Sequence, residues 1–337
     1  MKLLKNLQYY VILGVAGFLS VYAFAPYNKP LFIILSLFGL IWVTNQLPTK
    51  QMILGALIFG SSFFLAQLYW MFYSLYSVIK VGVLNSTLGM LGFVVFLSIY
   101  IIISLLLFRF CKTKSEEFNY LFLLPSVWVI GEWLRGWVFT GFSWCDIAYT
   151  QVNNYLLQGV FPVLGSYGVS WFAVSIIGFL FYVLINNKIM TIRNPKITLS
   201  HRLALLYFVV VAIAGYYMHG IEYTSKYGEP IKISLIQGNV NGAEKWDSNV
   251  FLKHLDMYSK MISNSKADIT ILPETAFPLY MDYLPVGYLD DIKKLAEMNN
   301  SALIIGMPKK IDSDGNYVNS ATVVTESGYP YYAKSHL

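Results

Sequence analysis

The sequence predicts a multi-pass α-helical membrane bundle of seven spans, followed by a partial α/β domain on the outer side of the membrane. Two features of its composition carry this prediction. The chain is 56% hydrophobic and only 12% charged, with a positive mean hydropathy, which is far from the balance of a soluble protein. Its acidic residues are also unevenly placed, since only four of the 18 precede Glu222. After that point, long apolar runs give way to short alternating elements.

This change in composition predicts a boundary between a transmembrane helical domain, residues 1–221, and an outer domain, residues 222–337. The first part has 13 Lys and Arg against four acids, and the second has 11 against 14, so their formal charges are +9 and −3. The excess positive charge belongs to the loops of the membrane domain. It therefore gives no reason to expect nucleic acid as a partner.

Seven apolar stretches are long enough to cross a hydrocarbon layer roughly 30 Å thick. They run over residues 8–25, 31–47, 52–76, 83–108, 119–139, 160–185 and 203–221. Only Pro26 to Pro30 separates the first two, so we expect a tight helical hairpin there. The first stretch, with Lys2 and Lys5 before it, also resembles a secretory signal. We favour a membrane span, because Pro26 follows the small residues directly and further spans come after.

The placement of Lys and Arg in short loops predicts the orientation of the bundle. With the N-terminus in the cytoplasm, ten basic residues fall on the inside and three, Lys29, Lys80 and Arg135, on the outside. Because the number of predicted spans is odd, residues 222–337 are then expected outside the cytoplasm.

Glu132 and Arg135 are unusual, because they lie near the outer end of an otherwise apolar fifth span, in a segment rich in tryptophan that runs to Trp144. Charges are costly there. One interpretation is an ion pair between the two residues, three positions apart, with the tryptophans at the membrane interface. The other is a binding site for a lipid head group. The sequence leaves both open.

The outer domain alternates strands and helices. Its predicted elements are a strand at 231–236, a turn at 237–239, an amphipathic helix at 246–263, a strand at 268–272, a helix at 288–299, and strands at 302–305, 317–325 and 329–333. This order is typical of a layered α/β domain. Because the chain ends directly after a strand, we expect an unfinished sheet with an exposed edge.

Glu274 is the candidate base of this domain. Ile269, Ile271 and Leu272 predict a buried strand, and Pro273 cannot donate a ladder hydrogen bond, so the strand should stop there and present the next side chain. A carboxylate at a strand end is a rigidly mounted general base. A solvated turn is the alternative that this short pattern also allows.

Several motifs together resemble the apolipoprotein N-acyltransferase family, a membrane-anchored branch of the nitrilase superfamily. They are Gln237-Gly-Asn239, Lys245-Trp246, Leu272-Pro-Glu-Thr275 and Tyr332-Ala-Lys-Ser-His-Leu337, placed after seven spans. The segment Glu132 to Trp144 also resembles that family's Thr-Gly-Phe-Pro-Trp motif, with Ser143 in place of the proline. The resemblance implies a nitrilase-like (α-β-β-α) outer domain, of which residues 222–337 are the N-terminal part.

The resemblance implies that Glu274 and Lys334 are catalytic and that Trp246 helps to bind the acyl group or lipid. Glu132 and Arg135 are further candidates for substrate binding. The family's third catalytic residue is a downstream cysteine without a counterpart in these 337 residues, and its eighth span is also missing. We therefore expect the chain to be truncated at its C-terminal side relative to the family, with no nucleophile of its own.

The chemistry of such a triad is clear. A carboxylate takes the proton of a thiol and later returns it to a leaving group, and a lysine stabilises the oxyanion that forms. In the family, the cysteine takes an acyl chain from a phospholipid as a thioester, and the chain then passes to the N-terminal amine of a diacylglyceryl-cysteine apolipoprotein. The implied partners are therefore a phospholipid donor, an apolipoprotein acceptor and the membrane. The implied location is the bacterial cytoplasmic (inner) membrane, with the outer domain on the periplasmic side.

The two cysteines of the chain, Cys111 and Cys145, have neither a paired nor a metal-like spacing with histidine, so we expect no disulfide, metal or cofactor. Cys111 falls on the predicted inner side, across the membrane from Glu274. Cys145 falls on the outer side, yet no local base accompanies it.

Three classes of function are therefore open: an acyltransferase, an inactive remnant or lipid-binding partner without the nucleophile, and a transporter. The transporter is the least supported. The spans contain almost no ionisable residues, and no pair of broken helices recurs in two halves.

Overall fold

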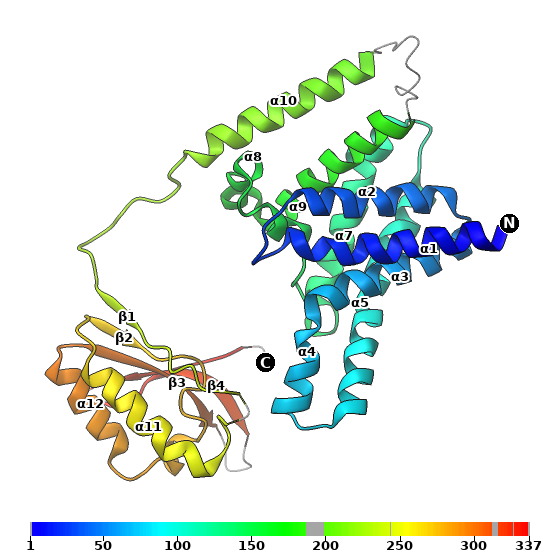
Figure 1. Cartoon of the computed structure of the whole chain (residues 1–337). Coiled ribbons are helices and arrows are strands. Elements are labelled where there is room, and N and C mark those ends of the chain that lie inside the picture. Colours follow the sequence, from blue (N-terminus) through cyan, green and yellow to red (C-terminus); the bar gives the residue numbers. More distant parts are fainter. Residues whose placement is uncertain (1, 187–198, 243, 312–315, 326, 336–337) are drawn as a thin grey trace. The chain divides into compact units, whose positions relative to one another are not determined.

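The computed structural model describes residues 2–186, 199–242, 244–311, 316–325 and 327–335. The chain divides into two compact units, shown in Figure 1. Met1–Ser225 form the helical unit, and Lys226–Leu337 form the sheet unit.

The helical unit is built from helices alone in its described part. Its α-helices are α1 (Lys2–Leu19), α2 (Leu31–Gln46), α3 (Thr49–Leu68), α4 (Trp70–Tyr73), α5 (Val83–Cys111), α6 (Glu116–Phe118), α7 (Leu124–Trp137), α8 (Tyr155–Gln158), α9 (Phe161–Phe181) and α10 (Leu199–His219). Over the described ranges, four stretches are long and apolar enough to cross a membrane, namely Asn6–Ala23, Thr49–Leu68, Val83–Cys111 and Phe161–Leu184. Two shorter apolar helices, Leu31–Gln46 and Leu205–His219, bring the range to four to six.

Several of the seven predicted spans are not single regular α-helices, and two of them show the clearest breaks. In the stretch predicted at 52–76, α3 ends at Leu68 and is followed by the short α4 and a π-helical turn, Ser74–Val78. In the stretch predicted at 119–139, a π-helical turn at Asn119–Leu123 precedes α7. Hydropathy averaged over a window does not reveal such breaks, because it is insensitive to where the backbone changes its hydrogen-bond pattern.

A glycine contact joins α10 to the rest of the helical unit. In Figure 1, α10 runs outside the main bundle and approaches it at α8. A Cβ added at Gly215 of α10 would collide with the carbonyl oxygen of Leu156 in α8, so only glycine allows this approach. Small residues at close helix crossings are typical of membrane bundles.

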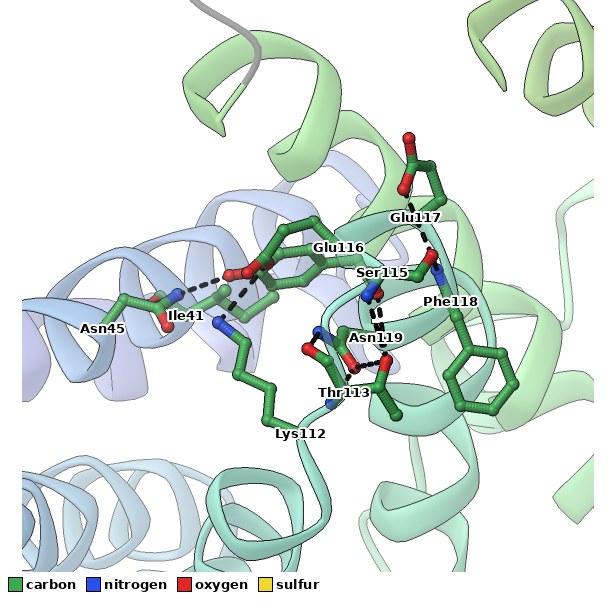
Figure 2. Close-up of polar contacts among 10 residues, drawn as sticks. Ile41, Asn45, Lys112, Thr113, Ser115, Glu116, Glu117, Phe118 and Asn119 are labelled. Carbon is green, nitrogen blue, oxygen red and sulfur yellow. Dashed lines mark hydrogen bonds and ion pairs between the residues drawn. The ribbon is translucent and has the colours of Figure 1, made fainter. Parts of the chain in front are cut away.

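A set of polar contacts holds the turn between α5 and α6, as Figure 2 shows. The Asn119 side chain accepts from the backbone N–H of Thr113 at 2.8 Å and donates to the Thr113 carbonyl at 2.9 Å. Ser115 caps α6 by accepting from the N–H of Phe118 at 3.2 Å. The Asn119 side chain is buried, so these hydrogen bonds satisfy polar groups that solvent does not reach.

The sheet unit is a five-stranded mixed sheet with two helices. Its elements are β1 (Ile233–Leu235), α11 (Ser248–Ser263), β2 (Ile269–Ile271), α12 (Tyr288–Met298), β3 (Ala302–Lys310), β4 (Tyr317–Val324) and β5 (Tyr331–Ala333). The strand order is β1-β2-β3-β4-β5, with the first three parallel and the last two antiparallel to their neighbours. Parallel neighbours need crossover helices, and α11 and α12 supply them. The predicted alternation of elements is confirmed.

Both helices cover one face of the sheet, where they lie side by side in Figure 1. Leu303 and Ile305 of β3 are buried there with Leu255, Tyr258 and Phe277. The opposite face carries half-buried or exposed side chains such as Ile271, Ile304 and Tyr332. This second face is the one on which the candidate site lies.

The third strand is longer than the predicted 302–305. It continues to Lys310, because β4 pairs with it from Leu303 opposite Val324 to Lys310 opposite Tyr317. Glycine and proline usually weaken a strand, and this segment contains both, at Gly306 and Pro308. Beyond Ile304, however, β3 has left the short β2 and keeps only β4 as its neighbour, and a proline is tolerated in such an edge position.

Candidate active site

A tight turn after β2 presents Glu274. The backbone N–H of Leu272 still donates to Ile304, at 2.9 Å, and the N–H of Ala276 then donates back to Pro273 at 3.1 Å. Thr275 has a φ of +52°, a left-handed conformation that is unfavourable for a β-branched residue. Such backbone strain is common at functional sites. The turn therefore fixes where the Glu274 side chain starts.

Gly306 makes room for this turn. A Cβ at that position would collide with the carbonyl oxygen of Pro273 and with the Cα of Glu274. The absence of a side chain lets β3 pass directly beneath the turn, and the Phe277 N–H donates to the Gly306 carbonyl. Gly306 follows the strand predicted at 302–305, so this role could not be assigned from sequence; inside the observed β3, it is a glycine at a close backbone approach.

Lys334 and Glu274, which the sequence predicted to share one site, lie in contact. The Lys334 Nζ is 3.3 Å from Glu274 Oε1, and the side chains are 50% and 64% exposed. Lys334 follows β5, whose pairing with β4 carries the side chain toward the turn. An exposed pair of this kind adds little to stability. The contact places a carboxylate and an ammonium group side by side.

Asn319 of β4 connects the two candidates. Its side-chain amide donates to Glu274 Oε1 at 2.7 Å, and its backbone carbonyl accepts from the Lys334 N–H at 2.8 Å. Its side-chain oxygen also accepts from the Thr275 hydroxyl at 3.4 Å. Sequence reasoning missed Asn319, because a single asparagine in a predicted strand carries no signal. Only the strand register reveals its position.

Glu274 lies between two cavities. One, of about 240 Å³, is polar and includes Gln237, Asn239, Lys245 and His254 in its lining. The other, of about 270 Å³, lies on the open sheet face and is lined in part by Tyr332 and Lys334. A carboxylate with space on both sides can exchange protons with groups that enter either cavity.

Lys245 is half-buried beside Glu274. Its Nζ donates to the Glu274 backbone carbonyl at 3.2 Å. Burial lowers the pKa of Lys245, and the nearby Glu274 charge partly opposes that shift.

Trp246 precedes α11 instead of opening it, since the helix begins at Ser248. The indole is 62% exposed and lines a separate cavity of about 120 Å³ with Phe251 and Leu279. It is therefore not a core tryptophan of the sheet unit.

Glu132 and Arg135 of α7 do not pair with each other, which corrects the ion pair considered above. Arg135 pairs with Asp146, and its Nη1 donates to the Trp144 carbonyl at 2.6 Å. Glu132 instead accepts from the Trp128 indole at 3.0 Å and from the Ile147 N–H at 2.8 Å. Glu132 and Arg135 are buried, with 5% and 4% of their surface exposed. Through these contacts, both side chains hold the segment that follows α7.

That segment lines a large cavity of the helical unit, of about 750 Å³. Trp144 and Cys145 reach the cavity, together with Trp70 and Tyr149. Cys145 has a φ of +67°, and Phe139 and Thr140 are also left-handed, so the segment is strained and needs its buried partners.

The two cysteines, Cys111 and Cys145, both belong to the helical unit. Cys111 is exposed at the end of α5, and Cys145 is partly buried. Within the described ranges, no group of three His, Cys, Asp or Glu side chains could hold a metal ion.

Comparison with known proteins matches both units to families. Residues 16–180 match the apolipoprotein N-acyltransferase N-terminal domain, and residues 232–337 match the carbon-nitrogen hydrolase family.

Among curated relatives, the apolipoprotein N-acyltransferase of Chromobacterium violaceum is 30% identical over 326 residues, which are 96% of this chain and 60% of the relative. That of Coxiella burnetii is 30% identical over 97% of this chain and 65% of the relative. That of Haemophilus influenzae is 26% identical over 100% of this chain and 64% of the relative. The chain thus spans less than two thirds of the length of these relatives.

Proposed function

Because the chain belongs to the apolipoprotein N-acyltransferase family, we propose that it takes part in acyl transfer from a phospholipid to an apolipoprotein. It provides the membrane anchor, the general base and the cation that stabilises the oxyanion. The observation that carries the proposal is the contact of 3.3 Å between Lys334 and Glu274 at the end of β2. Asn319 supports it by fixing the carboxylate at 2.7 Å. No cofactor is needed for this chemistry.

Two transfers make up the proposed reaction. A cysteine thiol attacks the ester carbonyl of the phospholipid while Glu274 takes its proton, and Lys334 stabilises the oxyanion. The C–O bond then breaks, and Glu274 returns the proton to the departing lysophospholipid. In the second transfer, the N-terminal amine of the apolipoprotein attacks the thioester, the C–S bond breaks, and an amide forms. A proton from the amine, passed through Glu274, restores the thiol.

In this proposal neither Cys111 nor Cys145 is the nucleophile. Cys111 falls on the predicted inner side of the membrane. The carboxylates near Cys145 are already engaged, Asp146 by Arg135 and Glu132 by the Trp128 indole and the Ile147 N–H. A second candidate function follows from this point. If the 337 residues act alone, the chain binds lipid or lipoprotein without transferring the acyl group.

In the helical unit, Glu132 and Arg135 support substrate binding without contacting the substrate. They hold the strained segment with Trp144, which lines the cavity of about 750 Å³. Trp246 contributes an exposed aromatic surface in the sheet unit. The proposed location is the bacterial cytoplasmic membrane, crossed by the seven predicted spans, with the N-terminus inside and residues 222–337 outside.

A chimera tests the proposal. Residues 1–337 are continued by the part of the Chromobacterium violaceum relative that lies beyond the matched region, and a bacterium depleted of its own N-acyltransferase is the host. We expect N-acylated lipoprotein by mass spectrometry, and a loss of 100-fold or more with Glu274→Gln or Lys334→Gln, on the order of general-base and oxyanion effects. Glu297→Gln, in an exposed part of α12, is the matched control.

An inactive chimera at normal expression, beside an active full-length relative, would refute the proposal. The unextended chain discriminates between the two candidates. If the unextended chain binds lipid but forms no thioester adduct, the 337 residues alone act as a binding protein. An acyl group on Cys145 would show that our exclusion of this cysteine is wrong.

A further inference from the structure

Two cavities of the sheet unit meet at Lys245 and Pro278, which line both. The first cavity, of about 240 Å³, is mostly polar, and the second, of about 120 Å³, is mostly apolar. Lys245 therefore stands at the boundary between a polar and an apolar compartment. A ligand that fills both must itself have a polar part next to an apolar part.

The Lys245 ammonium has no carboxylate partner among the residues that the structure describes. Its contact is the neutral carbonyl of Glu274, at 3.2 Å. The Glu274 carboxylate, which could have paired with it, is instead held by Asn319 and Lys334. The nearby Glu274 charge offsets only part of the cost of burying this cation, since burial still lowers the pKa of Lys245, and an anion that enters the cavity would offset more of it.

The apolar compartment is open to its surroundings. Trp246 lines it and is 62% exposed. Large apolar side chains grouped at a surface usually mark a binding surface. A tryptophan is well suited to hydrocarbon that adjoins a polar group, because its ring has an apolar body and a polar N–H.

We propose that Lys245 binds the phosphate of a phospholipid, while Trp246, Phe251 and Leu279 take the adjoining hydrocarbon. This inference rests on the proposed function, for which it names the group that selects the acyl donor. A lysine ammonium is a compact charge that suits phosphate, and a charge-assisted hydrogen bond is stronger than a neutral one. Neutral lipids such as diacylglycerol lack the group that Lys245 recognises.

Protection of Lys245 from acetylation measures this binding on the unaltered chain. The protein is treated with limiting acetic anhydride, and peptide mass spectrometry compares Lys245 with Lys253, an exposed lysine of α11 that serves as the internal control. The probes are dihexanoylphosphatidylglycerol, inorganic phosphate and dihexanoylglycerol. We expect the phospholipid to slow the acetylation of Lys245 at least about tenfold, with little change at Lys253.

The other two probes separate the sources of binding. Inorganic phosphate should protect only at concentrations at least roughly tenfold higher, because it lacks the apolar part, and dihexanoylglycerol should not protect. Equal protection by dihexanoylglycerol would overturn the role of phosphate. Equal protection by inorganic phosphate would overturn the lipid and leave a simple anion site.

Variants in the chimera give a second, kinetic readout. Lys245→Gln should raise the KM for phospholipid about tenfold or more with a smaller change in kcat, and Lys245→Arg should restore most of the affinity because it keeps the charge. If the chimera transfers acyl groups and Lys245→Gln leaves KM unchanged, this inference fails while the proposed function stands. If phospholipid protects Lys245 but the chimera is inactive, the proposed function fails alone.

Discussion

The Lys334 ammonium lies 3.3 Å from the Glu274 carboxylate across 60 positions of sequence. Three elements produce this contact: β3 passes beneath the Glu274 turn, β4 pairs with β3, and β5 with Lys334 at its end pairs with β4. The contact therefore depends on strand register, and single substitutions in the intervening strands should disturb it.

Asn319→Ala should lower acyl transfer by the chimera about tenfold to a hundredfold, because the Glu274 carboxylate loses its hydrogen bond of 2.7 Å and with it a fixed position. The measurement is kcat with saturating phospholipid. Asn264→Ala, at the exposed C-terminal end of α11, is the control and should leave kcat unchanged.

Asn319→Asp gives a separate signature. A second carboxylate beside Glu274 disfavours the ionisation of Glu274, so the acidic limb of the pH–rate profile should move to higher pH. Asn319→Ala introduces no charge and should not move the limb upward. A purely structural role for Asn319 would lower protein yield without shifting this limb.

Gly306→Ala should destabilise the sheet unit by about 1–3 kcal/mol, because the new methyl group collides with Pro273 and the Cα of Glu274. Denaturant unfolding, monitored by hydrogen exchange of β2 and β3, measures the loss. Gly287→Ala is the comparison, because Gly287 has a φ of +82° but an added Cβ there meets nothing within 4 Å, so its loss comes from backbone strain alone. Gly306 has no such φ, so an undiminished stability of Gly306→Ala would contradict the predicted collision.

Asp146→Asn should destabilise the helical unit by about 3–5 kcal/mol, since it removes the charge that balances the buried Arg135. Thermal unfolding in detergent measures the decrease in Tm. The double variant Arg135→Met with Asp146→Leu should recover part of the loss, because it removes both charges of the pair, while the buried Glu132 keeps its hydrogen bonds from Trp128 and Ile147. Lys112→Gln, which breaks a partly exposed pair with Glu116, should change stability by less than about 1 kcal/mol.

Lys245 should react with acetic anhydride at lower pH than Lys253. Because burial lowers its pKa, a larger fraction of the amine is neutral at any pH below the normal lysine range. The lowered pKa also affects stability. The unfolded chain binds the Lys245 proton more tightly than the folded chain does, so the free energy of unfolding of the sheet unit should rise as pH increases from the lowered pKa to the ordinary lysine pKa. Acetylation rates measured at a series of pH values give one curve for Lys245 and one for Lys253. Identical curves would contradict the predicted difference in reactivity.

Much of the fold could be predicted from sequence, because long apolar runs and strand–helix alternation are local properties. The amphipathic pattern before Ser263 predicted α11 to within two residues at its start. The continuation of β3 through Gly306 and Pro308 could not be predicted, since it depends on pairing with β4. Nor could the breaks in the predicted spans, where the backbone hydrogen-bond pattern changes within largely apolar sequence.

The sequence by itself determined the two-part organisation, the family and the identity of Glu274 and Lys334 as candidates, because composition and motifs are written residue by residue. Tertiary structure decided what surrounds them. Asn319, Gly306 and Lys245 reach Glu274 through register and turn geometry, and Arg135 takes Asp146 as its partner where spacing on one helix had suggested Glu132. Such contacts follow from distances between elements, which are fixed only when the elements pack.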